Sequence, residues 1–578
     1  MPRITVGELL VRCLRAEGVE LVTGIIDGAH IPIVVHTAKY GIRYVNTHHE
    51  EAAVHVAEGY ARIARKPGVV LGNPGCGTGN MLAGVVSAQA EGHPILAIGT
   101  LRSRLKGDPN RGGAWQSADT ESMARPITKY AATVRQWERL PEMMRAAFRA
   151  ALTGRPGPAY LAIPDELLLQ ELDADRLPPI HEAARYRVID MGAGDPAAIE
   201  RAADLLAGAK RVYVHAGKGV LWADGAAELV ALGEHLGACM GSSLGARGVV
   251  PESHPHCFHP FDLGGAGLAR AEADVVLVVG GRLGEYDAWG LPPMWGDPAA
   301  QTTIQIDADP LSIGLNRPVD VAIVADAKAA LRALLGAVRA RTGAHGEPPD
   351  LARYRAKSAE TMQQGVAYLG AECRSGVHPA RMVMAVRQKF PPEAITVLDG
   401  GNTTLTSVAF HPILSSPSFL YSVKMGYLGT GLPFALGARL AAPDRPVCLI
   451  SGDGAFGFHV MELETAVREE LPLVALVAVD DAWGMEKTAY LAMGYGAADW
   501  QHRGIDLASV SYDALARSMG CHGERAERNE DLEPALDRAL EAAAGGTPAV
   551  IHVRVDRDLN TRPPGWEQFR AARNVQGY

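Results

Sequence analysis

Short apolar runs alternate with amphipathic stretches along the whole chain. The runs are too short for ordinary helices, and the stretches between them place apolar residues at helical spacing. Strands that alternate with helices in this way are typical of parallel sheets covered by helices on both faces. We therefore predict an α/β protein built of doubly wound parallel-sheet domains, with strands that include residues 69–71, 95–98, 212–215, 275–279, 396–398 and 447–450.

Two stretches with the composition of linkers divide the chain into three parts of similar size. One covers residues 172–190 and contains Pro178-Pro179, and the other is RTGAHGEPPD at residues 341–350. A chain of 578 residues is too long for one hydrophobic core. We predict three domains, at residues 1–175, 190–340 and 371–578, the last with a polar C-terminal tail.

The last third contains the most informative local pattern, a strand, a helix and a second strand with an acidic residue after each strand. Residues 445–450 after Arg445, and residues 473–479, are apolar, and the segment between these two runs has helical spacing. Asp453, in a Gly-Asp-Gly turn, and Asp480 then lie at the same edge of a parallel sheet, where helix N-termini favour anions. Carboxylates with phosphate oxygens suit Mg²⁺, although an ordinary turn and an ordinary strand end explain each residue alone.

A glycine-rich turn in the middle part is a weak signal for a nucleotide. Ala216-Gly217-Lys218-Gly219 follows a predicted strand, but a single GxG at such a turn more often serves tight packing. We favour the packing interpretation.

Composition excludes several classes of protein. Lys+Arg 56 against Asp+Glu 65 gives a net charge of −9, which offers no basic surface for nucleic acid. No apolar run approaches the roughly 18–20 residues that cross a bilayer, and no signal-type stretch follows Met1, so we expect no membrane contact and a cytoplasmic location. The seven cysteines lack a CxxC pair, and we expect them to be reduced core residues.

Ordered motifs in the first third give the chain a family resemblance. Taken alone, Glu50 could be an acidic residue at a helix start that interacts favourably with the helix dipole. The segment around it, HHEEAAVHVAEGYARIARKPGVV, is however similar to the HEQAAxHxAxGYARxxGKPGV segment of thiamine diphosphate enzymes. Gly72-Asn73-Pro74-Gly75 with Asn80 resembles the family's GPGxxN turn, with Asn73 in place of a small residue, and RPITK and GRPGP follow in order. The 27-residue step from Asp453 to Asp480 resembles the family's GDG to Asn-Asn spacing. The chain is identified as a member of the acetolactate synthase-like superfamily.

The resemblance implies pyrimidine-binding, middle Rossmann-like and diphosphate-binding domains with thiamine diphosphate and Mg²⁺ as cofactors. Asp453, Asp480 and the carbonyl of Ala482 take the places of the metal ligands, and Asp480 departs from the usual Asn. Leu428 takes the place of the apolar wedge between the cofactor rings. The other implied cofactor contacts are Gly400, Gly401, Asn402, Thr403, Gly452, Gly454, Ala455, Gly484 and Met485, with Glu50 at the aminopyrimidine.

Glu50 is the predicted proton relay. Thiamine diphosphate reacts through a carbanion at C2, and a carboxylic acid bonded to the pyrimidine favours the imino form that removes the C2 proton. In the family this Glu comes from one subunit and the metal site from the other, which implies at least a homodimer and favours a homotetramer. Retention of Glu50, Leu428, Asp453 and Asp480 disfavours a non-catalytic scaffold.

Two polar residues bear on the substrate. His30 stands in a Gly-Ala-His-Ile turn that resembles that of benzaldehyde lyase, and Trp115-Gln116 resembles an aromatic-Gln pair of the same enzyme and of acetolactate synthases. A histidine of ordinary pKa suits acid-base work on an alcohol proton, although His30 could also be a satisfied loop residue. His49 is a second candidate.

The predicted activity is a carbon-carbon lyase or carboligase that acts on small 2-hydroxy ketones or 2-oxo acids through an enamine at C2. Alternatives are an acetolactate synthase-like pyruvate carboligase and a 2-hydroxyacyl-CoA lyase or oxalyl-CoA decarboxylase-like enzyme. The CoA alternatives would need a nucleotide site in the middle domain and a CoA-binding tail; residues 557–578 offer Arg562, Arg570 and Arg573. We predict no FAD, because Gly281-Arg282-Leu283-Gly284-Glu285-Tyr286 departs from the family's GxRFDDR.

Overall fold

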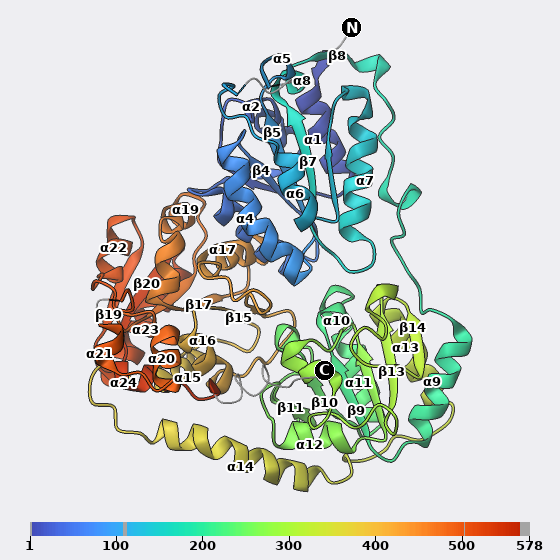
Figure 1. The fold of residues 1–578 in the computed structure, drawn as a ribbon, viewed down its shortest axis with the longest axis vertical. Coiled ribbons are helices and arrows are strands. Elements are labelled where there is room, and N and C mark those ends of the chain that lie inside the picture. The colour runs from blue at the N-terminus through green and yellow to red at the C-terminus, as the bar shows by residue number, and fades with distance from the viewer. Residues whose placement is uncertain (1–2, 108–111, 502, 567–578) are drawn as a thin grey trace.

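Three six-stranded parallel sheets, each flanked by helices, form the architecture (Figure 1). The computed structural model describes residues 3–107, 112–501 and 503–566. The first sheet has the order β3-β2-β4-β5-β7-β6. Its strands are β2 (Leu21–Gly24), β3 (Arg43–Asn46), β4 (Gly68–Gly72), β5 (Ile95–Leu101), β6 (Tyr130–Thr133) and β7 (Ala159–Pro164), with helices α1 (Val6–Ala16), α2 (Ile31–Thr37), α3 (Glu50–Ala64), α4 (Cys76–Glu91) and α7 (Leu140–Leu152).

The middle sheet has the order β11-β10-β9-β12-β13-β14. Its β12 reads VVLVV and is buried at every position, as expected for a parallel strand covered on both faces. The strands are β9 (Val212–Ala216), β10 (Cys239–Ser242), β11 (Cys257–Phe258), β12 (Val275–Val279), β13 (Thr302–Asp307) and β14 (Val321–Val324), with helices α9 (Pro196–Gly208), α10 (Lys218–Trp222), α11 (Ala226–His235), α12 (Gly265–Glu272) and α13 (Ala327–Arg339).

The third sheet has the order β16-β15-β17-β18-β20-β19. Its strands are β15 (Ile395–Asp399), β16 (Phe419–Leu420), β17 (Val447–Gly452), β18 (Val474–Val479), β19 (His522–Ala526) and β20 (Ala549–Arg554), with helices α15 (Pro379–Lys389), α16 (Asn402–Phe410), α17 (Gly431–Ala441), α20 (Gly484–Ala492), α22 (Tyr512–Ser518), α23 (Asn529–Ala544) and α24 (Arg557–Asn560). The predicted α/β class with three doubly wound parallel sheets is confirmed.

The first and third sheets share one topology. Within each, the second strand in the chain lies at one edge, followed across the sheet by the first, third, fourth, sixth and fifth. The strand order reverses between β2 and β4 in the first sheet and between β15 and β17 in the third. Open parallel sheets bind ligands at the carboxyl ends of strands where the order reverses. The fold thus marks two candidate binding edges.

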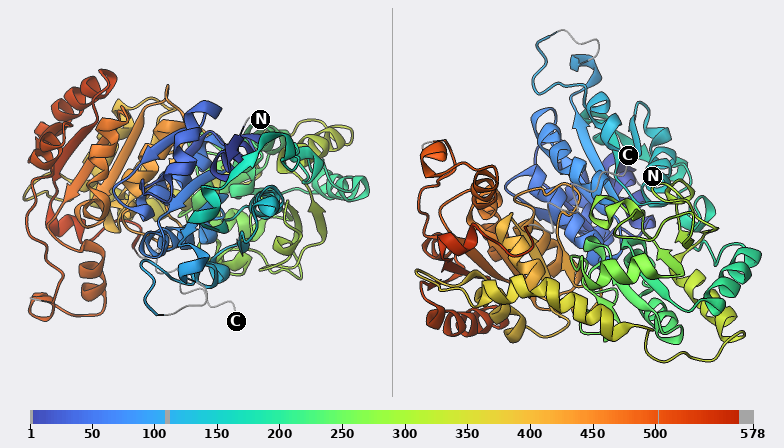
Figure 2. Two further views of the ribbon diagram at one scale, coloured as in Figure 1. Left: turned by 90° about the horizontal axis from the view of Figure 1, so that it is seen from above. Right: turned by 60° about the horizontal axis from the view of Figure 1, so that its bottom comes forward.

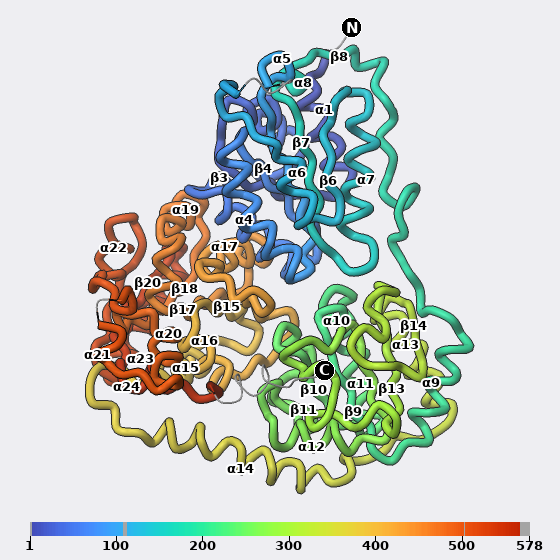
Figure 3. Tube along the Cα trace, in the orientation of Figure 1, coloured from blue at the N-terminus to red at the C-terminus, as the bar shows by residue number. Residues whose placement is uncertain are grey.

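The segments between the sheets agree in part with the predicted linkers (Figure 3). Residues 341–350 contain no helix or strand, and α14 (Leu351–Leu369) then leads from the middle sheet to the third. Leu172, by contrast, lies in β8 (Glu171–Asp173), which pairs antiparallel with β1 (Arg3–Thr5), so the first linker begins later than predicted. The three sheets fall within the predicted domain ranges, whose exact boundaries stay predictions.

The helix predicted after Asp453 is not continuous. It is broken into α18 (Asp453–Phe456), a 3-10 turn at Gly457–His459 and α19 (Glu462–Arg468). His459 contacts the Gly429 carbonyl through Nδ1 at 2.9 Å, and this contact from outside the segment holds the turn. The strand before it also starts later than predicted, at Val447, because Pro446 has no N–H for the ladder.

The first and third domains pack through backbone contact between α3 and α17. A Cβ at Gly437 would overlap the Val56 carbonyl oxygen, and one at Gly59 would overlap the carbonyl oxygen of Phe434. Such an approach between helices requires residues without side chains. Figures 1 and 2 show the first and third domains next to each other, and the contacts of Gly59 and Gly437 place α3 beside α17 there.

All three domains meet at Glu91, the last residue of α4. Lys218 of the middle domain pairs with Glu91 Oε2 at 2.6 Å, and the backbone N–H of Lys424 donates to Glu91 Oε1 from the third domain. Glu91 is 1% exposed. A buried carboxylate needs such partners, since an unpaired one is costly. Glu91 therefore ties the three domains together.

Cysteine placement corrects one expectation. Cys76 is exposed and Cys373 half-buried, so these two are not core residues, whereas the other five are buried. All seven lie in the described part of the chain and are unpaired. In the same part, no helix is long and apolar enough to cross a bilayer.

Replacing Gly437 by Ala is expected to destabilise the protein, because the new methyl group overlaps the Val56 carbonyl. Overpacking typically costs about 1–3 kcal/mol, so the melting temperature should fall by several degrees. Thermal unfolding followed by circular dichroism measures the change.

Gly336→Ala in α13 is the matched control, because nothing lies within 4 Å of its Cβ position. That change should be neutral or stabilise by about 0.5–1 kcal/mol. Equal melting temperatures for the two variants would contradict the role given to the contact between α3 and α17.

Candidate functional site

Three turns of the third domain meet where its strand order reverses. Gly400 and Gly401 follow β15, and a Cβ at Gly400 would lie 3.2 Å from the backbone nitrogen of Gly452 at the end of β17. The Thr403 hydroxyl reaches the same turn, 3.4 Å from the Gly452 Cβ position, and Ala455 lies 3.6 Å from that of Gly400. Met485, from the turn after β18, would be 2.6 Å from a Cβ at Gly401. The structure thus brings the turn residues predicted from sequence together.

Asp453 and Asp480 are the buried acids of this edge, 4% and 3% exposed. Asp453 accepts hydrogen bonds from the backbone N–H of Gly454 and of Asp481, both at 2.8 Å. Burial, with the nearby charge of Asp480, raises the pKa of Asp453 to about 7, and burial also raises the pKa of Asp480. Neither carboxylate has an ion-pair partner in the described chain. Two buried carboxylates without a cationic partner fit a bound cation.

Asn560 completes this edge from far along the chain. Its Nδ2 donates to Asp480 Oδ2 at 2.8 Å, and its backbone carbonyl accepts from Asn402 Nδ2 at 2.8 Å. Asn402 Nδ2 also donates to the Thr488 hydroxyl, which donates in turn to the Thr561 carbonyl. Asn560 and Thr488 could not be found from the sequence, because neither lies in a motif and only the folded α24 brings Asn560 here.

The same edge offers groups for an anion beside the cation. The helices α16 and α20 both begin here, and neither has a side-chain cap on its first N–H groups. Free N–H groups at helix N-termini bind phosphate well. The buried Oδ1 atoms of Asn402 and Asn560 lack a hydrogen-bond partner among the described residues and, as acceptors, suit the cation rather than the anion. The donor set therefore fits a metal-bound diphosphate.

Ala482 and Gly484 lie next to the acids. A Cβ at Gly484 would be 3.0 Å from Asp480 Oδ2. Ala482 lies opposite Asp506 in an antiparallel β-bridge. The hydrogen bonds of this bridge are made by the Trp483 N–H and the Asp481 carbonyl, and they do not involve the Ala482 carbonyl. The ring of Trp483 covers Gly454, 2.8 Å from its Cβ position. Ala482 as a metal ligand stays a prediction.

In the first domain, the turn from β4 to α4 gathers the three predicted catalytic residues. Glu50, 5% exposed at the start of α3, accepts from Asn80 Nδ2 at 3.1 Å, and its Oε1 lies 2.5 Å from the Cβ position of Gly77. His30 Nε2 is 3.2 Å from the Gly72 carbonyl. The Gln116 carbonyl lies 2.7 Å from the Cβ position of Gly75. One turn, Gly72 to Gly77, thus joins residues from three separate segments.

His30 is fully buried before α2, and burial lowers its pKa. Nδ1 lies 3.0 Å from the Ile25 carbonyl and Nε2 lies 3.2 Å from the Gly72 carbonyl, so each ring nitrogen faces an acceptor. Nε2 is also 3.3 Å from the Thr100 hydroxyl.

Gln116 adopts a left-handed backbone conformation, φ +52°. Its Oε1 accepts from Arg102 Nη2, and its Nε2 points to Cys76 Sγ at 3.8 Å. A left-handed non-glycine residue is uncommon and is found often at functional sites. Arg102 is a neighbour that the sequence did not single out.

Leu428 is half-buried in the loop before α17. The adjoining Tyr427 packs edge-on against His55 of α3, with ring centroids 5.3 Å apart. The loop therefore lies at the junction of the first and third domains. Its role as a wedge stays a prediction.

One cluster with metal-ligating atoms was not predicted as a metal site. The ligand atoms of His49, Glu51 and His459 lie within 4.8 Å of one another, between α3 and the turn before α19. The predicted metal site at Asp453 has only two ligating side chains, Asp453 and Asp480, because its third predicted ligand is a backbone carbonyl. Glu51 stands where the family segment has Gln.

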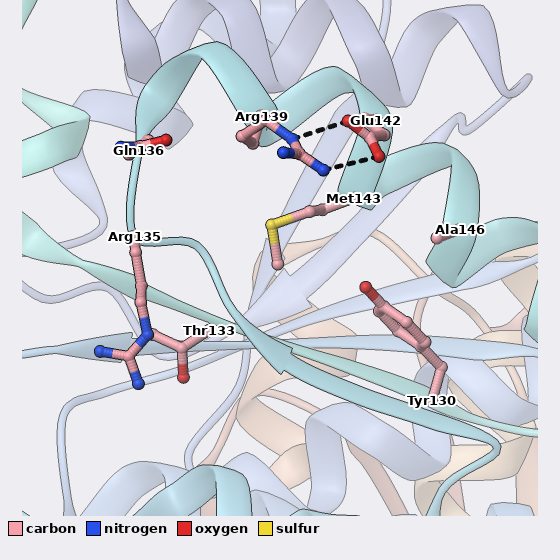
Figure 4. Close-up of a pocket in the computed structure, with 8 residues that line it drawn as sticks. All are labelled: Tyr130, Thr133, Arg135, Gln136, Arg139, Glu142, Met143 and Ala146. Carbon is pink, nitrogen blue, oxygen red and sulfur yellow. Dashed lines mark hydrogen bonds and ion pairs between the residues drawn. The ribbon is translucent and has the colours of Figure 1, made fainter.

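One surface hollow lies away from the predicted site residues. A hollow of about 280 Å³ between β6 and α7 is lined by Tyr130, Arg135 and the ion pair of Arg139 with Glu142 (Figure 4). None of the predicted site residues lines it.

The glycine turn of the middle domain is occupied by protein. A Cβ at Gly219 would be 2.6 Å from the Cα of Gly280, and Gly217 packs against the same turn. Lys218 is paired with Glu91. These contacts support the packing interpretation. Of the tail cations, Arg570 and Arg573 lie outside the described residues.

Comparison with known proteins agrees with this arrangement. Three protein-family models match in order: the thiamine pyrophosphate enzyme N-terminal TPP binding domain at residues 4–123, the central domain at 199–334 and the C-terminal TPP binding domain at 399–553. The two binding domains contain the two groups of predicted site residues, which we call half-sites. The first half-site comprises His30, Glu50 and Gln116, and the second comprises Asp453 and Asp480 with the turns around them. A sulfoacetaldehyde acetyltransferase of Alcaligenes xylosoxydans is 30% identical, over 96% of this chain and 94% of its own length. The chain is a thiamine diphosphate enzyme of the acetolactate synthase-like superfamily.

Other relatives of this thiamine diphosphate enzyme carry different names. A probable acetolactate synthase large subunit of Methanocaldococcus jannaschii is 29% identical, over 97% of this chain and 93% of its own. A probable 2-ketoarginine decarboxylase of Pseudomonas aeruginosa is 31% identical, over 94% and 92%. The family is therefore established, and the relatives differ in the reactions that their names describe.

Asp480→Asn is expected to weaken Mg²⁺ binding in the presence of thiamine diphosphate at least tenfold, about 1.4 kcal/mol, because the site loses one of its two charges. Isothermal titration calorimetry with the purified protein measures the affinity.

Asp481→Asn is the matched control. The Asp481 side chain pairs with Arg554, its backbone N–H remains available to Asp453, and Asn tolerates its left-handed conformation, φ +52°. Its affinity for Mg²⁺ should stay within twofold. If both variants bind Mg²⁺ like the original protein, the charge of Asp480 does not contribute to binding of the cation.

Proposed function

We propose that this protein is a thiamine diphosphate- and Mg²⁺-dependent carbon-carbon lyase or carboligase that acts on small 2-hydroxy ketones or 2-oxo acids. The observation that carries the proposal is the convergence of His30, Glu50 and Gln116 on the turn from Gly72 to Gly77. A lyase or carboligase must move an alcohol proton as well as bind a carbonyl group, and this turn combines a histidine, a carboxyl group and an amide.

Each half-site has a distinct task in the proposed reaction. When bound, thiamine diphosphate supplies a carbon nucleophile for a substrate carbonyl. Asp453, Asp480 and the Ala482 carbonyl hold Mg²⁺, and the N-termini of α16 and α20 bind the diphosphate. Glu50 holds a proton at the aminopyrimidine, and Asn80 fixes the orientation of its carboxyl group at 3.1 Å.

His30 and Gln116 would act on the substrate. Burial disfavours the charged form of His30, and a neutral imidazole can take a proton from a hydroxyl group through the ring nitrogen that carries the lone pair. Gln116 donates through Nε2, because Arg102 occupies its Oε1. The ring of His30 must turn away from the Gly72 carbonyl to meet a substrate, as it is fully buried in the single chain.

The proposed working unit is a homodimer or a larger assembly. In the described chain, Glu50 contacts residues of its own domain, and Asp453 and Asp480 contact only the third domain. Figure 1 shows α5 (Arg104–Gly107) and α8 (Asp165–Leu168), which follow β5 and β7, at the end of the first domain that points away from the third. A second subunit would bring opposite half-sites together. Large apolar side chains near the half-sites support this: Ile31 is 55%, Trp115 75% and Phe458 52% exposed.

Two other activities follow from the relatives. Acetolactate synthase and 2-ketoarginine decarboxylase are names of enzymes that act on 2-oxo acids, so a pyruvate carboligase or a decarboxylase is the second candidate. The packed turn around Gly217 offers little support for a nucleotide-bearing substrate such as an acyl-CoA. We keep the prediction that the protein carries no FAD.

Glu50→Gln is expected to retain thiamine diphosphate but to lower turnover at least a hundredfold, because an amide does not exchange a proton with the aminopyrimidine. Steady-state kinetics with the best donor, and calorimetry of cofactor binding with and without Mg²⁺, measure the two effects.

Glu51→Gln, at the next position, restores the residue of the family segment and should keep turnover within a few-fold. Full turnover in Glu50→Gln would overturn the proton-relay role. Cofactor binding that does not depend on Mg²⁺ would instead favour a non-catalytic scaffold.

A donor screen should identify the reaction. Benzoin-type hydroxy ketones, pyruvate, benzoylformate and acyl-CoAs are offered with thiamine diphosphate and Mg²⁺, and released aldehyde and carbon dioxide are measured. Aldehyde from hydroxy ketones without carbon dioxide from oxo acids selects the lyase. Carbon dioxide from pyruvate with a coupled product selects the carboligase, and no turnover of any donor contradicts the proposed function.

A further inference from the structure

Arg102 is a cationic residue at the first half-site that the proposed reaction does not yet use. It directly follows β5, which lies beside β4 in the sheet, so it stands at the same edge as the turn from Gly72 to Gly77. Nη2 donates to Gln116 Oε1. Through Gln116 it is linked to Gly75 and Cys76 at the start of α4.

Most of the hydrogen-bonding capacity of Arg102 is uncommitted. A guanidinium has five N–H donors, and within the described chain the structure gives this one a single hydrogen bond, to Gln116. Its Nε is buried without a partner among the described residues. The side chain is 25% exposed, which leaves it open to a ligand.

The charge of Arg102 is only partly balanced. The closest carboxylate is that of Asp165, with 3.6 Å between Nη1 and Oδ2, which is too long for a hydrogen bond. The neighbouring Glu166 is taken by Arg104, at 2.8 Å from Nε. A partly desolvated arginine with free N–H groups is well suited to a carboxylate or sulfonate, which accepts two parallel hydrogen bonds.

Resting on the proposed function, we propose that Arg102 binds a carboxylate or sulfonate group that the substrate keeps through the reaction. A carboxylate that leaves as carbon dioxide loses its charge in the transition state, and an arginine bound to it would stabilise the ground state more than the transition state. A retained anion is bound equally in both states. Arg102 therefore selects substrates by a charged group away from the bond that is made or broken.

The substrate class that follows is a small anionic aldehyde or 2-oxo acid in the acceptor position. Gln116 would contact the reacting oxygen through Nε2 while Arg102, on the other side of the same amide, binds the anion. Only the amide group of Gln116 separates its Nε2 from the Arg102 guanidinium, so the anion must lie within a few bonds of the reacting carbonyl. Neutral aldehydes would react without this contact and with weaker binding.

Arg102→Gln tests the proposal with the thiamine diphosphate- and Mg²⁺-loaded protein. With the active donor held constant, the KM for glyoxylate and sulfoacetaldehyde should rise at least tenfold with kcat within threefold, and the KM for acetaldehyde should stay within twofold. Arg102→Lys, which keeps the charge without the planar fork, should recover part of the loss. Equal changes for charged and neutral acceptors, or no change, would overturn the proposal.

Arg104→Gln is the matched control, two residues away and engaged with Glu166 and the Arg135 carbonyl. It should leave the preference for anionic acceptors unchanged.

Binding of the unreactive anion ethanesulfonate, measured by calorimetry on the same loaded proteins, separates the two proposals. Binding that weakens at least tenfold in Arg102→Gln supports the anion site even if no donor turns over, in which case the proposed function alone fails. Binding that is absent in the original protein, or unchanged in Arg102→Gln, overturns the anion site even where turnover confirms the function.

Discussion

The backbone contact between α3 and α17 is the constraint on which the rest of the structure depends. Gly59 and Gly437 allow the two helices to touch without intervening side chains. The helix α3 begins at Glu50, and α17 begins three residues after Leu428, so this contact fixes how the first and third domains face each other. Glu91 then adds the middle domain through Lys218. Two binding edges with the same strand order are thereby held in one rigid frame.

The fold could be predicted from sequence because its signals are local. A parallel strand covered on both faces must be apolar throughout, so runs such as Val275–Val279 identify themselves. The break in the helix after Asp453 could not be predicted, since it depends on the contact of His459 with the Gly429 carbonyl from a distant loop. Cys76 was wrongly predicted to be a core residue for a related reason. It is exposed because it begins α4 in the turn after β4, and composition does not reveal that position.

The candidate site also contains residues that could be predicted from the sequence and residues that could not. Turn residues such as Asp453, Gly401 and Glu50 belong to motifs of fixed spacing, and the structure places them at the edges where strand order reverses. Asn560 and Arg102 carry no motif. Each acquires its meaning only from a partner distant in sequence, Asp480 in one case and Gln116 in the other. Sequence patterns therefore identified the turn residues that meet at the candidate site, whereas Asn560 and Arg102 could be placed there only with the fold.

The bond between Asn560 and Asp480 has a consequence for biosynthesis. Asp480 leaves the ribosome 80 residues before Asn560, so the sheet edge that carries both acids is synthesised before its final partner. Domains fold in the order in which they emerge, and α24, which carries Asn560, is the last helix or strand of the described chain. The sheet end that carries Asp453 and Asp480 therefore reaches its described form only when synthesis of the third domain is nearly complete.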